Sequence, residues 1–338
     1  MFSNLPGVEI DGWPGNLLRK YAVWHMHWPD SLLNIPNTPK AIYKVNGMLA
    51  TMDFLRLRGT KAIWTMHNFA SHEARHPALE RSFWRRFIPR VDGAIALSSM
   101  GLKKAFERFP QLRDIPTTVI PHGHYREQYP LVDVDSRKIL GIPNDVKVMM
   151  FFGAVRAYKN VDVLVRAFRK VKRQDALLYV VGDPNSKELS IKIAEAASGD
   201  HRISLKFEFV DPKNVSIYLR AADLVVLPYR HVLNSGSALL ALSCSRPVLV
   251  PDLGAMGELR IDFSDTWVRT YEGHLTEYIL EDGLDWSTRP RPAICPMPER
   301  YEWKSIGLET VEFYKKVVSG SLQRSESTRY VATGDGSR

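Results

Sequence analysis

Short apolar runs alternate with helix-period segments along most of this chain, and no other feature constrains its fold more. Runs such as KAIWTMHN, VMMFFG and DLVVLPY are apolar at successive positions, which is typical of strands covered by helices on both faces of a sheet. Between them lie amphipathic segments such as HPALERSFWRRFIPRV and SKELSIKIAEAASG. Such alternation indicates βαβ units and a parallel sheet. The sequence therefore predicts an α/β fold.

The alternation occurs in two series, separated by the polar, turn-rich segment 132–145. We expect two Rossmann-like domains with a cleft between them, residues 1–138 forming the first and 139–300 the second. Residues 301–320 read as a C-terminal helix that could pack back toward the first domain, and the polar residues 321–338 as a disordered tail. The first series lacks an early strand, glycine-rich turn and helix, so its domain looks truncated. Either the start is unusually short or a strand is missing from the sequence.

The net charge of +9 is concentrated in the first 140 residues, which contain 19 basic and 12 acidic side chains. A basic excess of this kind indicates an anionic partner, such as nucleic acid, anionic lipid or an anionic substrate. We find no single-strand-binding motif, and therefore expect no nucleic acid.

One predicted helix interleaves Phe83, Trp84 and Phe87 with four arginines, which are Arg81, Arg85, Arg86 and Arg90. Arginine mixed with aromatic residues suits an anionic membrane surface. The alternative is a solvated helix face with Trp84 in the core. Two cysteines cannot form a disulfide framework, and no apolar run reaches the roughly 18 residues of a membrane span. We expect a cytoplasmic protein, peripheral to the inner face of the plasma membrane if the arginines bind lipid.

Three strand ends of the second series carry residues that suit phosphate. Arg156 and Lys159 follow VMMFFG, and Gly182 and Asp183 follow LLYVVG. The run Asn234–Ser237 follows DLVVLPY and opens an apolar helix. Ligands of open α/β sheets bind at the carboxyl ends of the strands, and phosphates bind the free amides at helix N-termini. The alternative is that Asn234 or Ser235 only caps the helix.

Histidines follow strands of the first series. His67 and Asn68 end KAIWTMHN, and His122 follows TTVIP. The preceding run ends in His27, Trp28 and Asp30, where an aromatic ring and a carboxylate would suit a sugar. His25 and His27 share one face of the strand, but no third metal ligand lies nearby in sequence, so we expect no metal. His67 could instead be a cap or a satisfied strand-end histidine.

These features together resemble the GT-B glycosyltransferases of the family 4 type and their bacterial exopolysaccharide relatives, which include mannosyltransferases. The resemblance covers about residues 20–320. It is carried by FFGAVRAYKNVDVLVRAF, YVVGDPN, LRAADLVVLPY and SGSALLALSCSRPVLVP. It implies that the domain spanning residues 1–138 faces the acceptor and the domain spanning 139–300 binds a nucleotide sugar.

The resemblance also implies roles for single residues. The donor diphosphate would contact Arg156, Lys159, Ser235, Gly236 and Ser237. The nucleobase and ribose would lie beside Gly182, Asp183 and Val210. His67 would be catalytic, and the acceptor side would include His27, Trp28, Asp30, Asn68 and His122.

The activity implied is metal-independent transfer of a hexose to a saccharide or a lipid-linked saccharide, with GDP-mannose favoured as the donor. The nucleotide sugar is then a substrate, and no cofactor is needed. The family usually carries two glutamates around the helix that follows Asn234, at positions that hold Val232 and Leu240 here. This departure leaves open both retention and inversion, and also a non-catalytic protein of the same fold. A basic nucleic-acid-binding protein is a weaker alternative.

Overall fold

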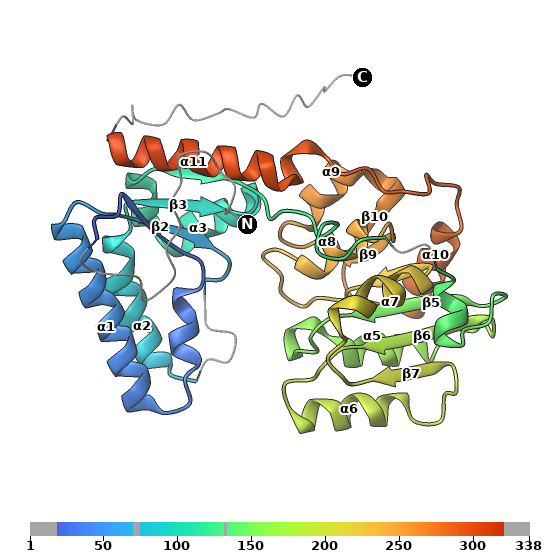
Figure 1. Cartoon of the computed structure of the whole chain (residues 1–338). Helices are drawn as coiled ribbons and strands as arrows, with labels where there is room; N and C mark the ends of the chain where they lie inside the picture. The colour runs from blue at the N-terminus through green and yellow to red at the C-terminus, as the bar shows by residue number, and fades with distance from the viewer. Residues whose placement is uncertain (1–18, 70–74, 132–133, 321–338) are drawn as a thin grey trace, which may run out of the picture.

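The computed structural model describes residues 19–69, 75–131 and 134–320. They form two α/β halves, each built on a parallel sheet, which confirms the predicted fold class (Figure 1). The expectations of a truncated start and a disordered tail fall on residues 1–18 and 321–338, outside the described residues. No helix in the described ranges combines the length and hydropathy needed to cross a bilayer.

The first half contains a four-stranded sheet in the order β1-β2-β3-β4. Its strands are β1 (Val23–Met26), β2 (Lys61–Met66), β3 (Gly93–Ala96) and β4 (Thr117–Val119). Its helices are α1 (Thr38–Leu57), α2 (Pro77–Phe87) and α3 (Ser99–Arg108), with short 3₁₀ turns at Pro29–Asn34, Ile88–Arg90 and Pro110–Asp114. Helix α1 begins where the Asn37 side chain accepts a hydrogen bond from the Lys40 amide, and the chain turns at Gly59 with φ +87°.

The aromatic residues of α2 lie in the core of the first half. Phe83, Trp84 and Phe87 are buried against Trp64 of β2. The position of Trp84 in the core agrees with the alternative interpretation of this helix, while the binding of its arginines to lipid stays a prediction. Its aromatic rings cannot face a membrane.

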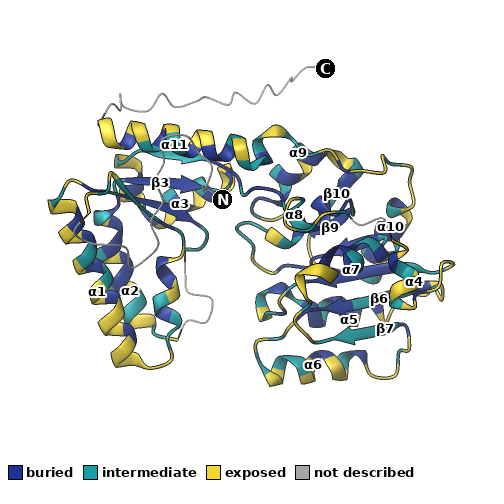
Figure 2. Ribbon diagram, in the orientation of Figure 1, coloured by how far each residue is buried: buried dark blue, intermediate teal, exposed yellow. Residues whose placement is uncertain are grey.

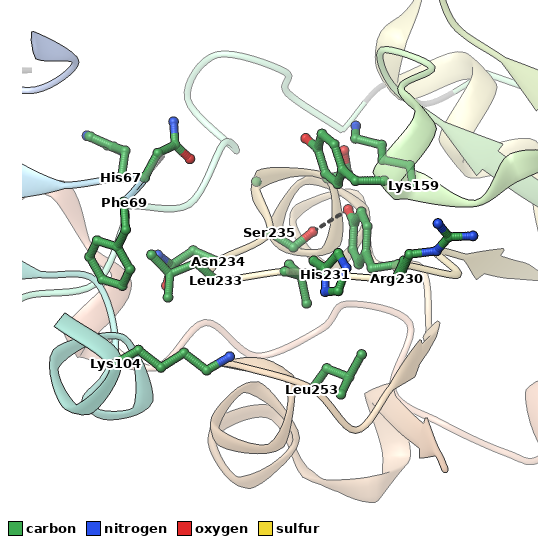
Figure 3. A pocket seen from close by; sticks show the side chains of 16 residues that line it. His67, Phe69, Lys104, Lys159, Arg230, His231, Leu233, Asn234, Ser235 and Leu253 are labelled. Atoms are coloured by element: carbon green, nitrogen blue, oxygen red, sulfur yellow. Dashed lines mark hydrogen bonds between the residues drawn. The ribbon is translucent and has the colours of Figure 1, made fainter. Parts of the chain in front are cut away.

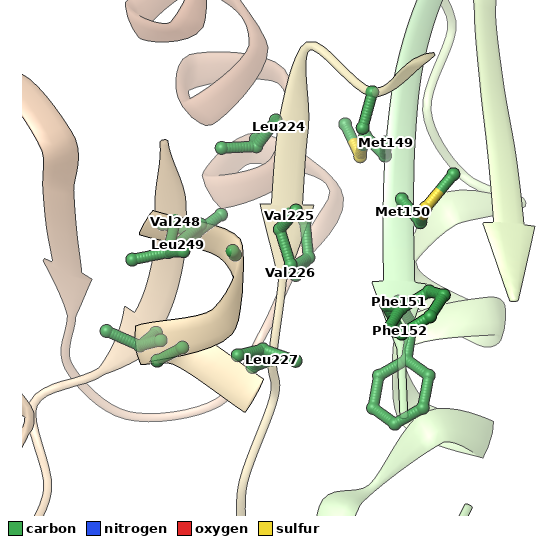
Figure 4. Packing of buried hydrophobic residues seen from close by; sticks show 14 of the residues in the cluster. Met149, Met150, Phe151, Phe152, Leu224, Val225, Val226, Leu227, Val248 and Leu249 are labelled. Carbon is green, nitrogen blue, oxygen red and sulfur yellow. The ribbon is translucent and has the colours of Figure 1, made fainter. Parts of the chain in front are cut away.

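The second half contains a six-stranded sheet in the order β10-β9-β8-β5-β6-β7. Its strands are β5 (Lys147–Phe152), β6 (Ala176–Val181), β7 (Ile203–Lys206), β8 (Leu224–Val226), β9 (Val248–Pro251) and β10 (Val268–Tyr271). The first strand of this half lies in the middle, and the strand order reverses between β5 and β8, as in Rossmann folds. Figure 4 shows β5, β8 and β9 packed side by side through buried residues such as Phe151, Val226 and Leu249.

The helices of the second half are α4 (Ser136–Leu140), α5 (Val161–Phe168), α6 (Lys187–Ala197), α7 (Val215–Ala221), α8 (Gly236–Ser243), α9 (Met256–Trp267) and α10 (Glu277–Ser287). Helix α5 ends at Phe168, with Arg169 as its C-cap residue. Strand β7 ends at Lys206, and Phe209 in the segment that follows is 82% exposed.

Helix α11 (Trp303–Ser319) returns to the first half (Figure 1). Its residues Ile306, Phe313 and Val317 form a buried cluster with Ile63, Ile95 and Ile120 of the first half. A Cβ atom added to Gly93 of β3 would lie 2.8 Å from Val317, so the helix lies directly on the sheet. In Figure 2 the side of α11 that faces the sheet is buried and its outer side is exposed.

Candidate active site

Two loops meet at the point where the strand order of the second sheet reverses. The loop after β5 contains Gly153 and Lys159, and the loop after β8 leads to the start of α8. Gly153 has φ +119°, and a Cβ atom there would lie 2.8 Å from Ser237 Oγ and 3.6 Å from Lys159 Nζ. The positive φ and this close approach both require glycine. The fold therefore brings the predicted residues Lys159 and Ser237 together.

Ser235 caps α8, because its side chain accepts a hydrogen bond from the Ala238 amide. Its hydroxyl also lies 2.6 Å from Tyr229 Oη, a contact within the loop from β8 to α8, and both residues line the same cavity. Ser235 can therefore cap the helix and still face a ligand in the cavity. The amides of Gly236 and Ser237 have no partner within the helix, and both residues line the cavity.

Lys159 is a buried cation that lacks an acidic partner among the residues that the structure describes. The residue is 8% exposed, and no described carboxylate lies within ion-pair distance of its ammonium group. Burial, with the nearby Arg156 charge, lowers the pKa of Lys159 to about 8. A buried charge without a counter-ion is unfavourable, so this environment suits an anionic ligand.

A cavity of about 490 Å³ lies between the two halves (Figure 3). From the second half it is lined by Lys159, Tyr229 and the residues Asn234–Ser237. From the first half His67, Asn68, Phe69 and Lys104 complete it. We call this space the first cavity.

A second cavity of about 300 Å³ adjoins the first. The two share five lining residues, which are His67, Asn68, Asn234, Ser235 and Gly236. Trp28, His122 and Tyr125 line only the second cavity, together with Glu258 and Arg300 from the other half. Ligands in the two cavities would therefore meet between His67 and Gly236.

His25, His27 and His67 form a cluster beside the cavities, in which the His25 and His27 ring centroids are 4.4 Å apart. His27 Nδ1 lies 3.1 Å from His67 Nε2, and the Trp28 ring stacks on His67 with 4.4 Å between ring centroids. His25 contacts Thr65 Oγ1 at 2.7 Å and Tyr314 Oη at 2.5 Å. Among the described residues no group of three His, Cys, Asp or Glu side chains could hold a metal ion.

The buried histidines are held neutral. Burial, reinforced by neighbouring imidazoles, lowers the pKa of both His25 and His67 to about 3. Burial also lowers the pKa of His27 and His122. A neutral imidazole can donate or accept one hydrogen bond, but with so low a pKa it is a weak base until an anion binds nearby.

The low pKa of His25 predicts a loss of stability in mild acid. Above pH 6.5 the imidazole is neutral in both the folded and unfolded states, so this stability is fully present. As the pH falls from 6.5 toward 3, the unfolded state binds a proton that the folded state cannot bind. The free energy of unfolding should then fall by up to about 1.4 kcal/mol per pH unit.

His25→Gln offers partners to Thr65 and Tyr314 but does not titrate, so urea unfolding at pH 7 and pH 5 should show a smaller drop for this variant. Asp30 titrates with the opposite sign, because burial raises its pKa to about 6. Asp30 is present in both the unchanged protein and His25→Gln, so its contribution cancels when the two are compared. An equal drop in both would contradict the assignment to His25.

Asp30 lines neither cavity, although the sequence predicts it to face an acceptor. It is 3% exposed and hydrogen-bonded to Asn68. Asn68 lines both cavities, whereas the Asp30 carboxylate lies behind Asn68 and lines neither. His27 is likewise behind His67, whereas Trp28 is 56% exposed and lines the second cavity.

Arg156, Gly182, Asp183 and Val210 also lie outside both cavities. The Arg156 guanidinium donates to the carbonyl oxygens of Val155, at 2.8 Å, and Asp183, at 3.0 Å. A Cβ atom at Gly182 would lie 2.1 Å from Gly153 O, so glycine is needed where the loops after β5 and β6 touch. Their predicted contacts with a ligand stay predictions.

Sequence patterns missed several residues of these cavities. Tyr229 follows β8, and the strand-end rule used for Asn234 could have found it. Tyr125 had no local signal, and only the fold brings its hydroxyl to 2.9 Å from a Cβ atom built on Gly236. Glu258 reaches from α9 across to α3, where its carboxylate accepts from the amides of Ser99 at 2.9 Å and Met100 at 2.6 Å.

Comparisons with known proteins identify the family of this chain. A family model described as Glycosyl transferases group 1 matches residues 146–272. A GDP-mannose:glycolipid 4-beta-D-mannosyltransferase of Xanthomonas campestris pv. campestris is 30% identical over 291 residues, which cover 86% of this chain and 78% of that protein. The lipopolysaccharide core biosynthesis mannosyltransferase LpsB of Rhizobium meliloti is 32% identical over 187 residues, or 52% of this chain and 50% of LpsB. The chain therefore belongs to the group 1 glycosyltransferases.

Solved structures show the same fold at lower identity. HepE of Anabaena, in complex with UDP and glucose, has a TM-score of 0.62 and 18% identity, covering 87% of this chain and 80% of HepE. The sucrose-phosphate synthase of Thermosynechococcus elongatus also has a TM-score of 0.62, with 16% identity over 89% of this chain and 75% of the synthase. The predicted GT-B fold and glycosyltransferase activity are confirmed.

Proposed function

We propose that this glycosyltransferase transfers mannose from GDP-mannose to the saccharide of a glycolipid. The donor and acceptor are those named for the Xanthomonas relative. The observation that carries the proposal is the convergence of Lys159 and the start of α8 on a cavity that His67 closes from the other half. Breaking the bond between a sugar and a diphosphate requires positive charge on the leaving group. Lys159 and the free amides of α8 supply it.

The second cavity suits the acceptor saccharide. One face of Trp28 stacks on His67, and more than half of the residue is exposed, so a sugar ring could pack on the free part of its ring. Asn68 offers an amide that can hydrogen-bond sugar hydroxyls. An acceptor bound there would present its hydroxyl between His67 and Gly236, next to the donor.

We infer that the reaction inverts the sugar configuration. The mannose of GDP-mannose is α-linked, whereas the relative is named for a β linkage. In one displacement the acceptor oxygen would bond to the sugar C1 atom as the bond from C1 to the diphosphate oxygen breaks. The hydroxyl proton would pass to the His67 imidazole, whose pKa the bound diphosphate raises. No carboxylate at position 232 or 240 is needed for this route.

A panel of sugar nucleotides tests the donor. GDP-mannose at a hundredfold excess over its Kd should raise the free energy of unfolding by about 2.7 kcal/mol. UDP-glucose and UDP-N-acetylglucosamine should raise it much less, as measured by thermal unfolding. Proton NMR of the product from a water-soluble saccharide acceptor should then show a β-mannoside. An α-mannoside would overturn the inverting route, and preference for a UDP sugar would overturn the donor.

We also propose that the protein works at an anionic membrane surface, where Arg81, Arg85, Arg86 and Arg90 attract lipid headgroups. A glycolipid acceptor is embedded in a bilayer, which supports this location. Two of the arginines are already engaged, because Arg86 donates to Asn46 at 2.9 Å and Arg90 forms a bidentate pair with Asp53 at 2.8 and 2.9 Å. Arg81 and Arg85 would therefore make most of the headgroup contacts from this helix.

A further inference from the structure

Helix α1 exposes an apolar stripe to solvent. Tyr43 is 74% exposed, Phe54 42% and Leu57 89%. Gly47 and Ala50, also exposed, lie between them. The spacing of three or four residues places all five on one side of the helix, and none of them is polar at the surface except for the Tyr43 hydroxyl. We call Tyr43, Gly47, Ala50, Phe54 and Leu57 the α1 stripe.

The opposite side of α1 already supplies the core. Ala41, Val45, Leu49, Met52 and Leu55 are buried in the first half. The helix is therefore apolar on two sides, although packing requires only one. Single exposed apolar residues are ordinary, but a continuous stripe along a helix of 20 residues marks an interaction surface.

Positive charge surrounds the stripe. Helices α1 and α2 lie side by side in Figure 1 and contact each other. Residues 38–58 and 77–90 together contain eight basic and two acidic side chains, whereas the whole chain contains 46 and 37. One of the two acidic residues, Asp53, is paired with Arg90. The basic residues are Lys40, Lys44, Arg56, Arg58, Arg81, Arg85, Arg86 and Arg90.

We propose that the α1 stripe inserts into the interface of an anionic bilayer while the surrounding lysines and arginines bind its headgroups. An apolar stripe bordered by basic residues has the character of an interfacial membrane helix. A second copy of this chain is a poor occupant, because it would bring an equally basic surface against this one. The aromatic side chains that would enter the membrane therefore come from α1, and not from α2 as the sequence suggests. The inference rests on the proposed function only in that a glycolipid acceptor requires an approach to lipid.

Vesicle sedimentation tests the stripe directly. The full chain should sediment with vesicles of phosphatidylcholine and phosphatidylglycerol at low salt, and poorly with phosphatidylcholine alone. Changing Tyr43, Phe54 and Leu57 together to Gln should lower the partition coefficient at least tenfold without changing the net charge. A matched control changes three apolar residues of the second half to Gln. These residues are Ile191, Ile261 and Tyr278, which are exposed to a similar extent. The control should bind vesicles like the unchanged protein.

The readouts separate this inference from the proposed function. Both triple variants should keep their thermal unfolding midpoint and their transfer of mannose to a water-soluble saccharide. Full vesicle binding by the stripe variant would overturn the inference, as would an equal loss in the control variant. So would a change of the stripe variant from dimer to monomer in size-exclusion chromatography, which would assign the stripe to a second copy. Failure of the unchanged protein to transfer mannose would overturn the proposed function and leave the vesicle result valid.

Discussion

Replacing His67 with alanine is expected to lower turnover by about 10²- to 10⁴-fold, the usual effect of a positioned acid–base group. His67 is the histidine that both cavities share, and the reacting sugar would lie against it. The affinity for GDP should hardly change, because in the proposed function the start of α8 and Lys159 would bind the diphosphate from the other half. Steady-state kinetics and calorimetric titration with GDP measure the two effects separately.

His67→Gln distinguishes proton transfer from hydrogen bonding. Glutamine keeps a donor and an acceptor but cannot take the acceptor proton. Activity near that of the unchanged protein would assign His67 a hydrogen-bonding role, and activity as low as in His67→Ala would support the role of a base. The contacts with His27 and Trp28 are lost in the alanine variant, so its unfolding midpoint must be measured too. Full activity in His67→Ala would exclude any role in the reaction.

Replacing Lys159 with methionine is expected to weaken GDP binding by about 1.5–3 kcal/mol, the scale of a hydrogen bond to a charged group. Turnover should fall further, by about 10²- to 10³-fold, because charge develops on the diphosphate as the sugar leaves. Methionine fills the same space and removes an unpaired buried charge, so the folded state should be no less stable. Titration calorimetry with GDP and with guanosine separates the diphosphate contribution.

Arg156→Met provides the comparison for this experiment. The resemblance assigns both side chains to the diphosphate, but Arg156 is held by the carbonyl oxygens of Val155 and Asp183 and lies outside both cavities. We expect Arg156→Met to weaken GDP binding less than Lys159→Met. Unchanged GDP affinity in Lys159→Met would reject the diphosphate site, and a larger loss in Arg156→Met would show that Arg156 turns toward the ligand on binding.

Strands buried on both faces could be predicted from the sequence because they need apolar residues at every position. β5 and β8 are of this kind. The end of the second half had no such signal. β10 is an edge strand with two half-buried residues, and α9 contains Ser264 with φ +64° and ψ +166°, which interrupts its period. β10 is recognisable only from its pairing with β9 in the folded sheet.

The site was predictable where one strand end carries its own signal. Lys159 and the run from Asn234 to Ser237 lie at strand ends of one sheet, so the rule for ligand sites in open sheets brings them together. The contacts between the two halves follow from how the halves are packed. Glu258 and Tyr125 come from parts of the chain far from the residues that they contact. No local pattern encodes such a contact.

The path of α11 has a consequence for exchanging parts between relatives. Because α11 completes the core of the first half, a cut in the 132–145 segment would leave Ile63, Ile95 and Ile120 facing water. A working hybrid must therefore take its last helix from the parent that supplies the first half. The modular unit that evolution or a protein engineer can swap is the central segment, inserted between an N-terminal portion and its own returning helix.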